Sequence, residues 1–212
     1  IRWPDAILAQ DERLQEYKGY AAIAFARANK IDQLVIDSRK PRIGIVSSGK
    51  AYENVREALR HLGIDEKTAD KIGLRLYKVR MPWPLEPEGI RHFSEGLEEV
   101  LVIEERREVI EHQIKQQLFN WRADVRPRIV GKFDHKDNHI LKMNEDITSG
   151  VALRVIATRL LAFDLPADLE KRITEKLEYY NERHAKKVSH LAPVARTAHF
   201  CSGCPHNTST KV

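Results

Sequence analysis

The stretch RIGIVSSGKAYENVREALRHLG, residues 42–63, changes the period of its apolar residues partway along. Residues 43–46 are mostly apolar and indicate a buried strand, and the two serines and the glycine that follow are typical of a turn with a helix N-cap. From residue 52 to residue 62 the apolar side chains return at steps of three or four, as they do on one face of a helix. This stretch therefore predicts one strand–turn–helix unit.

Further units of the same kind follow along the chain. Alternating apolar residues predict a strand at 74–79, and the three prolines of PWPLEP (82–87) force an extended turn before the next helix. The continuous apolar run at 100–103 is typical of a central parallel strand, followed by a helix at 104–121 and a short strand at 128–130. Strands that alternate with helices in this way predict the α/β class, with an open, mainly parallel sheet and helices on both faces.

The segments on either side of this domain have another character. A helix is predicted at about 11–29, with apolar residues on one face. After residue 133 a polar loop precedes two helical patterns, with no further strand evident, so the α/β domain is followed by a helical extension. We divide the chain into a leading helix and connector (1–29), an α/β domain (30–133), a loop and helical linker (134–198) and a terminal segment (199–212).

Composition narrows the class of protein. Hydrophobic residues make up 42% of the chain and charged residues 32%, and no apolar run approaches the length of a membrane span. The net charge is +5, but acidic and basic residues are interleaved, so we expect solvated helix faces and no nucleic-acid partner. Two cysteines and the absence of a signal-peptide pattern at the start indicate the reducing cytoplasm. The start at Ile1 and the polar end also suggest a segment of a longer chain.

In an open α/β sheet, ligands bind beyond the carboxyl ends of the strands, so four loops are candidate sites: 47–49, 81–84, 104–105 and 131–132. Ser47, Ser48 and Gly49 open a helix and could contact an anion or a phosphate-bearing cofactor through backbone N–H groups. The alternative is that this turn only caps its own helix. The proline-rich loop suits either a packing corner or a docking surface.

Two other polar groups are weaker candidates. Glu104 and Glu105 end a strand, where a buried carboxylate could transfer a proton, but neighbouring strand residues point to opposite faces. With the two arginines that follow, they favour an exposed ionic cluster. His135 and His139 have a spacing seen in metal sites, yet neither a cysteine nor a third histidine is near them in sequence, so we expect a polar loop.

Both cysteines lie in the terminal stretch FCSGCPHNTSTKV, residues 200–212, as a Cys-x-x-Cys pair. Cys201 and Cys204 could form a redox dithiol, half of a zinc site or half of an iron–sulfur site. Structural zinc and iron–sulfur clusters usually take four ligands, and the nearby candidates are His199 and His206. If the thiols bind a metal, the remaining ligands are expected beyond Val212 or on a partner.

The chain resembles the central portion of indolepyruvate ferredoxin oxidoreductase, in the long fused form found in bacteria. The likeness is weakest from about residue 134 to residue 197. It is carried by GIVSSGKAYENVREALRHLGID, KVRMPWPLEPEGIRHFSEGLEEVLVIEERREVIEHQIKQQLFNW, RPRIVGKFD and FCSGCPHNTSTKV. In that family, an enzyme with thiamine diphosphate and Mg²⁺ decarboxylates an aryl-2-oxoacid, transfers the acyl group to coenzyme A and passes two electrons through iron–sulfur clusters to ferredoxin.

The resemblance implies a role for each part of the chain. Residues 30–133 would be similar to the C-terminal domain of transketolase, which helps to assemble the enzyme. CSGCPHN resembles the opening of the domain that binds thiamine diphosphate, so Cys201 and Cys204 would supply two ligands of a [4Fe-4S] cluster. Gly203 and His206 would lie at the cofactor there.

The family's other cysteines, its diphosphate-binding motif with the magnesium ligands and its pyrimidine-binding domain are missing from this sequence. We therefore expect no catalytic residue here, but a non-catalytic scaffold that belongs to a homo-oligomeric parent enzyme. The alternatives are an autonomous module that binds an anion, or that uses the dithiol for zinc or redox chemistry, and a plain oligomerisation domain.

Overall fold

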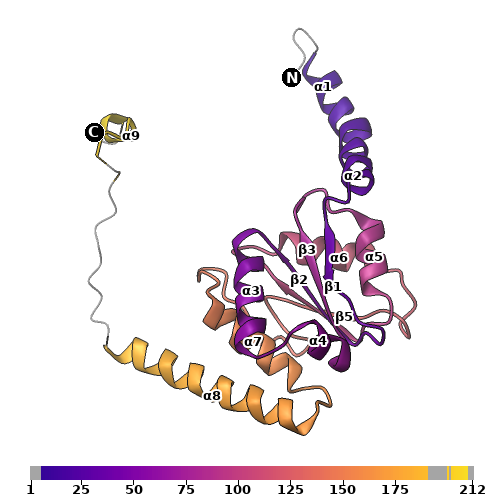
Figure 1. Cartoon of the computed structure of the whole chain (residues 1–212). Coiled ribbons are helices and arrows are strands. Elements are labelled where there is room, and N and C mark those ends of the chain that lie inside the picture. The colour runs from indigo at the N-terminus through magenta and orange to yellow at the C-terminus, as the bar shows by residue number, and fades with distance from the viewer. Residues whose placement is uncertain (1–5, 191–199, 201, 210–212) are drawn as a thin grey trace.

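A five-stranded sheet forms the centre of the molecule, with strand order β1-β3-β2-β4-β5 (Figure 1). The structure, a computed structural model, describes residues 6–190, 200 and 202–209. The strands are β1 (Gln33–Ile36), β2 (Ile43–Ser48), β3 (Leu74–Val79), β4 (Glu99–Ile103) and β5 (Arg128–Val130). Strands β2 to β5 run parallel to their neighbours, and β1 runs antiparallel to β3. This confirms the predicted open, mainly parallel sheet.

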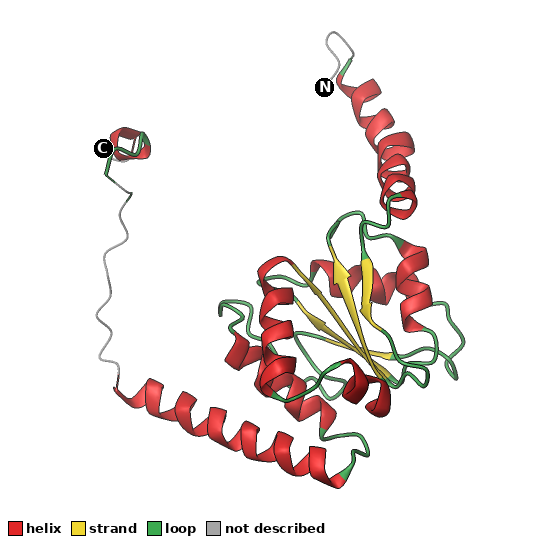
Figure 2. Cartoon of the chain, in the orientation of Figure 1, coloured by secondary structure: helices red, strands yellow, loops and turns green. Residues whose placement is uncertain are grey.

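Helices cover both faces of the sheet, as predicted (Figure 2). One face packs against α3 (Gly49–His61), α4 (Glu66–Ile72), α7 (Ser149–Leu160) and α8 (Ala167–His190). The other face packs against α5 (Pro87–Ser94) and α6 (Val109–Leu118). A short helix, α9 (His206–Ser209), lies in the terminal segment. Among the described residues, no helix is both long enough and apolar enough to cross a membrane.

The alternation of side chains along each strand explains the two cores. In β2, Ile43 and Ile45 belong to the cluster beneath α3, whereas Val46 belongs to the cluster beneath α5. Successive strand residues point to opposite faces, and both faces of β2 are covered, so this strand is buried almost throughout. Gly44 allows α5 to come close, because a Cβ there would lie 2.4 Å from the ring of Phe93.

The helix α7 joins the main core although it follows the polar loop. Ala152, Leu153, Ile156 and Leu160 are buried and belong to the same cluster as the strands and α3. The segment 134–198, assigned above to a helical linker, thus contributes a helix that covers the sheet. The division of the chain into domains stays a prediction.

The predicted leading helix is present, as three consecutive helical segments: α1 (Ile7–Arg13), η1 (Leu14–Lys18) and α2 (Gly19–Ala28). We call this stretch the arm. It projects from the sheet (Figure 1) and leaves the body where β1 begins. Gln33 pairs with Lys78, near the end of β3, so the arm rises from the edge at which the parallel strands end.

Candidate functional site

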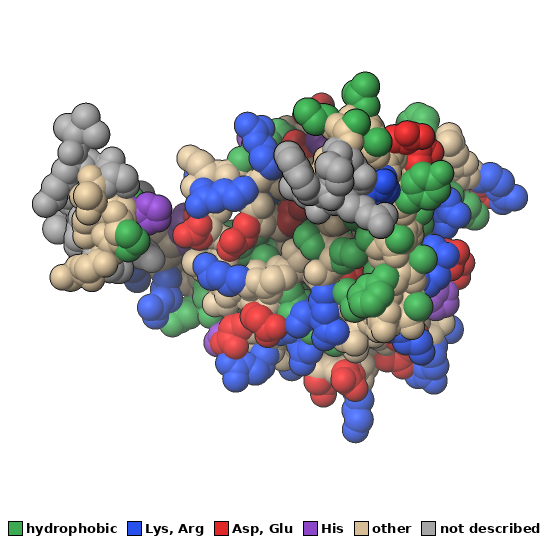
Figure 3. Space-filling model, turned by 90° about the horizontal axis from the view of Figure 1, so that it is seen from above, with side chains coloured by type: hydrophobic (Ala, Val, Ile, Leu, Met, Phe, Trp, Pro, Cys, Tyr) green, Lys and Arg blue, Asp and Glu red, His purple; other side chains and the backbone are tan. Residues whose placement is uncertain are grey.

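The loops predicted to carry a site meet at the carboxyl edge of the sheet, because β2 to β5 all run in the same direction. Figure 3 looks down on this edge, where Lys and Arg side chains alternate with Asp and Glu side chains. Two arrangements occupy the edge: an open groove beside the start of α3, and a buried polar cluster where β4 and β5 end.

The serines of the first loop have different environments. Ser47 is fully buried, and its hydroxyl donates to the carbonyl oxygen of Ile103 at 2.6 Å, so it links β2 to β4 and points away from solvent. Ser48 is the N-cap residue of α3, but its side chain makes no capping hydrogen bond. Gly49 has a positive φ of 52° and open space beside its Cα. Ser48 and Gly49 therefore remain available to a ligand, whereas the Ser47 hydroxyl is already used.

A groove of about 570 Å³ opens beside these residues. Three of its side chains are cationic: Lys50, Lys78 and Arg80. The Lys78 ammonium lies 4.0 Å from the centre of the Tyr52 ring and 3.4 Å from the carboxylate of Glu53. The groove thus combines an uncapped helix start with positive charge, which are the features that attract an anion.

Glu104 belongs to the buried cluster, so the prediction from the sequence was wrong for this residue. We predicted an exposed ionic cluster, but Glu104 is only 5% exposed. Its carboxylate turns back from the end of β4 and accepts hydrogen bonds from the backbone N–H groups of Val109, Ile110 and Glu111, at 2.8 to 3.1 Å. It thereby caps α6. Burial raises the pKa of the Glu104 carboxyl, and these three N–H groups oppose that rise.

Lys132 lies at the centre of the same cluster. Its side chain is buried, and its ammonium donates to the main-chain carbonyl oxygen of Glu104. Its backbone N–H donates to the Glu111 carboxylate at 3.0 Å, and that carboxylate also accepts from the Lys115 ammonium at 2.7 Å. Burial lowers the pKa of the Lys132 ammonium, while the neighbouring carboxylates raise it.

Glu111 is a member of the cluster that the sequence interpretation did not identify. A signal was present, because Glu111 precedes the buried Ile114 by three residues and so lies on the core-facing side of α6. Gly131 is also required here, since a Cβ at that position would lie 2.1 Å from a Glu111 carboxylate oxygen. The cluster joins β4, β5 and α6 through internal hydrogen bonds.

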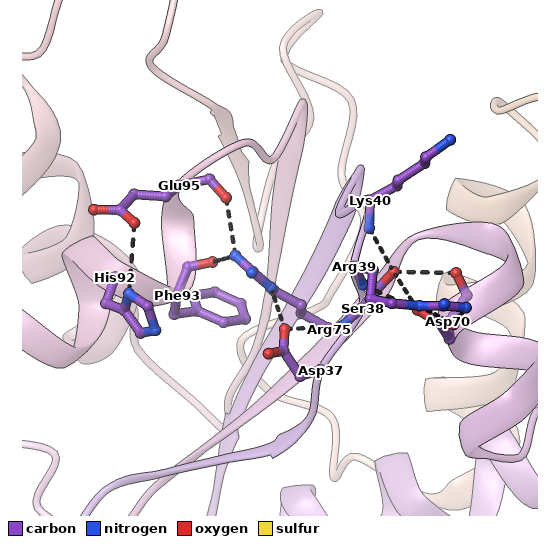
Figure 4. Close-up of polar contacts among 9 residues, drawn as sticks. All are labelled: Asp37, Ser38, Arg39, Lys40, Asp70, Arg75, His92, Phe93 and Glu95. Carbon is purple, nitrogen blue, oxygen red and sulfur yellow. Dashed lines mark hydrogen bonds and ion pairs between the residues drawn. The ribbon is translucent and has the colours of Figure 1, made fainter.

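The opposite edge of the sheet holds a structural network (Figure 4). The Arg75 guanidinium binds the Asp37 carboxylate at 2.7 Å and the carbonyl oxygens of Phe93 and Glu95 at 3.1 and 2.9 Å. Nearby, Asp70 accepts from the backbone and the guanidinium of Arg39, at 2.9 and 3.0 Å, which lowers the pKa of Asp70 to about 2. These contacts fasten the loop after β1 to its neighbours.

The polar loop after β5 is organised around Asp134. Its carboxylate accepts from the backbone N–H groups of Lys136 and Asn138 and from the Asn138 side chain, which lowers the pKa of Asp134 to about 2. The His139 ring lies 4.2 Å from the Phe133 ring. Asp134 is therefore committed to the shape of the loop.

The proline-rich loop is held by Gln113 of α6. The Gln113 side chain accepts from the backbone N–H of Leu85 at 2.8 Å and donates to the carbonyl oxygen of Pro82 at 2.8 Å. Trp83 is 66% exposed on this loop. The anchoring suits a packing corner and the exposed indole suits a docking surface, so both interpretations stay open.

The candidate metal ligands lie in the terminal segment. Cys201 lies outside the described residues, and Cys204 is a half-buried thiol without a disulfide. Gly203 has a φ of 80°, and the His206 ring lies 5.4 Å from the Phe200 ring. In the part of the chain that is described, no group of three His, Cys, Asp or Glu side chains could hold a metal ion. These residues alone do not fit a complete four-ligand cluster site.

Comparison with known proteins adds independent information. Residues 32–190 match the family model described as the indolepyruvate ferredoxin oxidoreductase middle domain. The chain is 30% identical over 168 residues to the indolepyruvate oxidoreductase subunit IorA of Pyrococcus abyssi and to that of Thermococcus kodakarensis. Each alignment covers 79% of this chain but 22% of the relative, so the chain spans about a fifth of the length of these relatives.

Two solved structures are also similar. One is a 2-oxoglutarate:ferredoxin oxidoreductase from Magnetococcus marinus, with 15% identity and a TM-score of 0.42, over 71% of this chain and 21% of that chain. The other is a split-gene transketolase in an inactive β4 tetramer, with the same identity and TM-score, over 61% of this chain and 41% of that one.

Proposed function

Because the chain belongs to the indolepyruvate ferredoxin oxidoreductase middle-domain family, we propose that it is a non-catalytic scaffold segment of a larger 2-oxoacid:ferredoxin oxidoreductase. The larger enzyme would convert an aryl-2-oxoacid such as indolepyruvate and coenzyme A to an acyl-coenzyme A and carbon dioxide. Two electrons would pass to ferredoxin. Residues 30–133, with the helices packed on them, would hold the neighbouring domains in place. We expect this enzyme to act in the cytoplasm and to be a homo-oligomer.

One observation supports the scaffold role above all. At the carboxyl edge, where an α/β sheet usually binds its ligand, polar side chains at the ends of β4 and β5 are engaged in internal hydrogen bonds. The Glu104 carboxylate accepts hydrogen bonds from the first N–H groups of α6, and the Lys132 ammonium donates to the Glu104 carbonyl oxygen. Ser47 donates its hydroxyl to Ile103. These three side chains, which lie where a proton could be transferred, thus serve the fold.

The terminal segment would have a separate task in the larger enzyme. Cys201 and Cys204 would supply two of the four ligands of a [4Fe-4S] cluster, and the other two would come from outside this sequence. Gly203 and His206 would lie where the domain for thiamine diphosphate and Mg²⁺ begins. The thiamine cofactor would supply the chemistry of decarboxylation, while this segment contributes position and half of a route for electrons.

The scaffold role can be tested in the full-length polypeptide by Gly131→Ala, a substitution that disturbs the buried cluster. A scaffold segment predicts less assembled enzyme and lower activity per mass, with an unchanged KM for the 2-oxoacid. A KM that rises several-fold would show that this edge contacts substrate and would contradict the proposal. The amount of assembled enzyme can be measured by size-exclusion chromatography.

A second candidate function is anion binding by the groove beside α3, and one observation favours it. Lys50, Lys78 and Arg80 line the same groove as the uncapped start of the helix. In this alternative the terminal dithiol would serve zinc or redox chemistry in an autonomous module. Stoichiometric zinc in the purified chain, or a thiol that reacts rapidly at neutral pH, would favour the alternative over the scaffold.

A further inference from the structure

The arm exposes an unusual amount of apolar surface. Six of the twelve large hydrophobic side chains that are exposed in the described part of the chain lie on it: Ile7, Leu8, Leu14, Tyr17, Tyr20 and Phe25. Such a concentration of exposed apolar side chains on one surface element marks a candidate contact surface for another domain.

Three of these side chains, together with Ala21, form a stripe. Leu14, Tyr17, Ala21 and Phe25 are all exposed and follow one another at steps of three or four residues. Within α2 this spacing places neighbouring side chains on the same side, and the preceding π-helical turn, Leu14–Lys18, continues the apolar surface. Tyr17 is 66% exposed and Phe25 62%. Within residues 7–28 only Ala26, near the base of the arm, is buried. The stripe is therefore not covered by the domain from which the arm projects.

The base of the arm is held firmly, which distinguishes it from a loose leader. The Arg27 guanidinium binds the carboxylates of Glu86 and Glu88, each at 2.8 Å, and Glu86 is buried. Just after the arm, Asp32 accepts hydrogen bonds from the backbone N–H groups of Arg80 and Met81, at 2.7 and 3.1 Å. These bonds fix the direction in which the stripe faces.

The size of the stripe restricts what could cover it. At about 1.5 Å per residue the stripe runs for about 17 Å from Leu14 to Phe25, and with a width of about 10 Å it offers on the order of 170 Å². A stable complex between separate molecules usually buries about 800 Å² on each partner. A second copy held by this stripe alone would therefore dissociate, whereas a domain on the same polypeptide, at an effective concentration in the millimolar range, could remain bound.

The family match indicates the same kind of partner. The matched region begins at residue 32, so the arm lies outside the middle domain itself. The relatives are also several times longer than this chain, with room for further domains. We propose that the stripe of Leu14, Tyr17, Ala21 and Phe25 docks in an apolar groove of a neighbouring domain of the same, longer polypeptide. This inference rests on the proposed function, because it needs the chain to be a segment of such a polypeptide.

Hydrogen exchange followed by mass spectrometry tests this proposal. Amide exchange over residues 7–28 is compared between the 212-residue chain and the full-length polypeptide. Docking predicts exchange at least about tenfold slower in the full-length polypeptide, and Phe25→Glu should remove most of this protection. Tyr20→Glu is the matched control, because Tyr20 is equally exposed but lies off the stripe, so protection should persist.

Two results would overturn the proposal. One is equal exchange in both polypeptides. The other is protection of the 212-residue chain that increases with its concentration, which would identify a second copy as the partner. Both variants should keep the unfolding midpoint of the 212-residue chain, since both side chains are exposed. Turnover of the full-length polypeptide with indolepyruvate is measured separately, so a failure of docking is distinguished from a failure of the proposed function.

Discussion

The ammonium of Lys132, just after β5, donates to the main-chain carbonyl oxygen of Glu104, just after β4. This bond lies inside the edge at which related architectures bind ligands, and both residues are buried. A lysine in such a place costs desolvation, which is offset only by the carbonyl and the carboxylates around it. Lys132 and Glu104, which could otherwise transfer protons, therefore have a structural role.

Lys132→Met should destabilise the domain by about 3 kcal/mol, because it leaves the Glu104 carbonyl and the nearby carboxylates buried without their cation. Urea unfolding followed by circular dichroism measures the change. Lys136→Met is the matched control on the exposed loop nearby, with an expected change within about 0.5 kcal/mol. Equal midpoints for the two variants would contradict the structural role of Lys132.

Glu104 should make stability depend on pH. Because burial raises its pKa in the folded state, the folded protein keeps this proton to a higher pH than the unfolded chain does. The contribution of Glu104 to the free energy of unfolding should therefore decline as the pH rises above about 4.3, the ordinary value for Glu. Glu104→Gln should remove this decline. A variant whose stability follows the same slope between pH 4 and 7 would show that the group does not titrate this way.

Asp70 should also make stability depend on pH, but at lower pH and in the opposite direction to Glu104. Arg39 holds the pKa of Asp70 at about 2, so its stabilising contribution is complete above about 3.9, the ordinary value, and is lost as the pH falls toward 2. Asp70→Asn should flatten the acid limb of the stability curve between pH 4 and 2. Glu178→Gln, on the exposed side of α8, should leave that limb unchanged. The measurement is the urea midpoint as a function of pH.

Substitution by alanine should lower the free energy of unfolding at one glycine and leave it unchanged or raise it at another. Gly131→Ala forces a Cβ to within 2.1 Å of a Glu111 oxygen, and the displaced buried carboxylate should cost about 2 kcal/mol or more. Gly150→Ala, in α7, finds ordinary contact at 3.4 Å from the Tyr180 ring and should be neutral or stabilising by up to about 1 kcal/mol. Thermal unfolding compares them. If Gly131→Ala is as stable as Gly150→Ala, the packing of the cluster is described incorrectly.

The sequence predicted the alternation of strands and helices because that information is local. Residues 43–46 and 100–103 carry dense apolar runs, and such runs indicate buried strands without reference to the rest of the chain. The strand order was not predicted, nor was the antiparallel direction of β1, since a four-residue strand carries no signal of its neighbours. The packing of α7 in the main core was not predicted either, because it depends on contacts between residues that are far apart in sequence.

The site was harder to predict for a physical reason. Glu104 begins a run of five charged residues, and such runs usually lie at the surface. Nothing local shows that one of these carboxylates turns back to cap α6. The stripe on the arm was identified by its period, but the sequence could not show that this face is exposed. Ser48 and Gly49 were correctly expected at a helix start, although their use by a ligand stays a prediction.

The central claim is that this chain supports a redox enzyme without catalysing its reaction. The most direct test is the reduction of benzyl viologen by the purified 212-residue chain, supplied with indolepyruvate, coenzyme A, thiamine diphosphate and Mg²⁺. The assay is made under conditions in which the full-length polypeptide is active. We predict no reduction above the rate without protein, and steady 2-oxoacid-dependent turnover by the isolated chain would contradict the account.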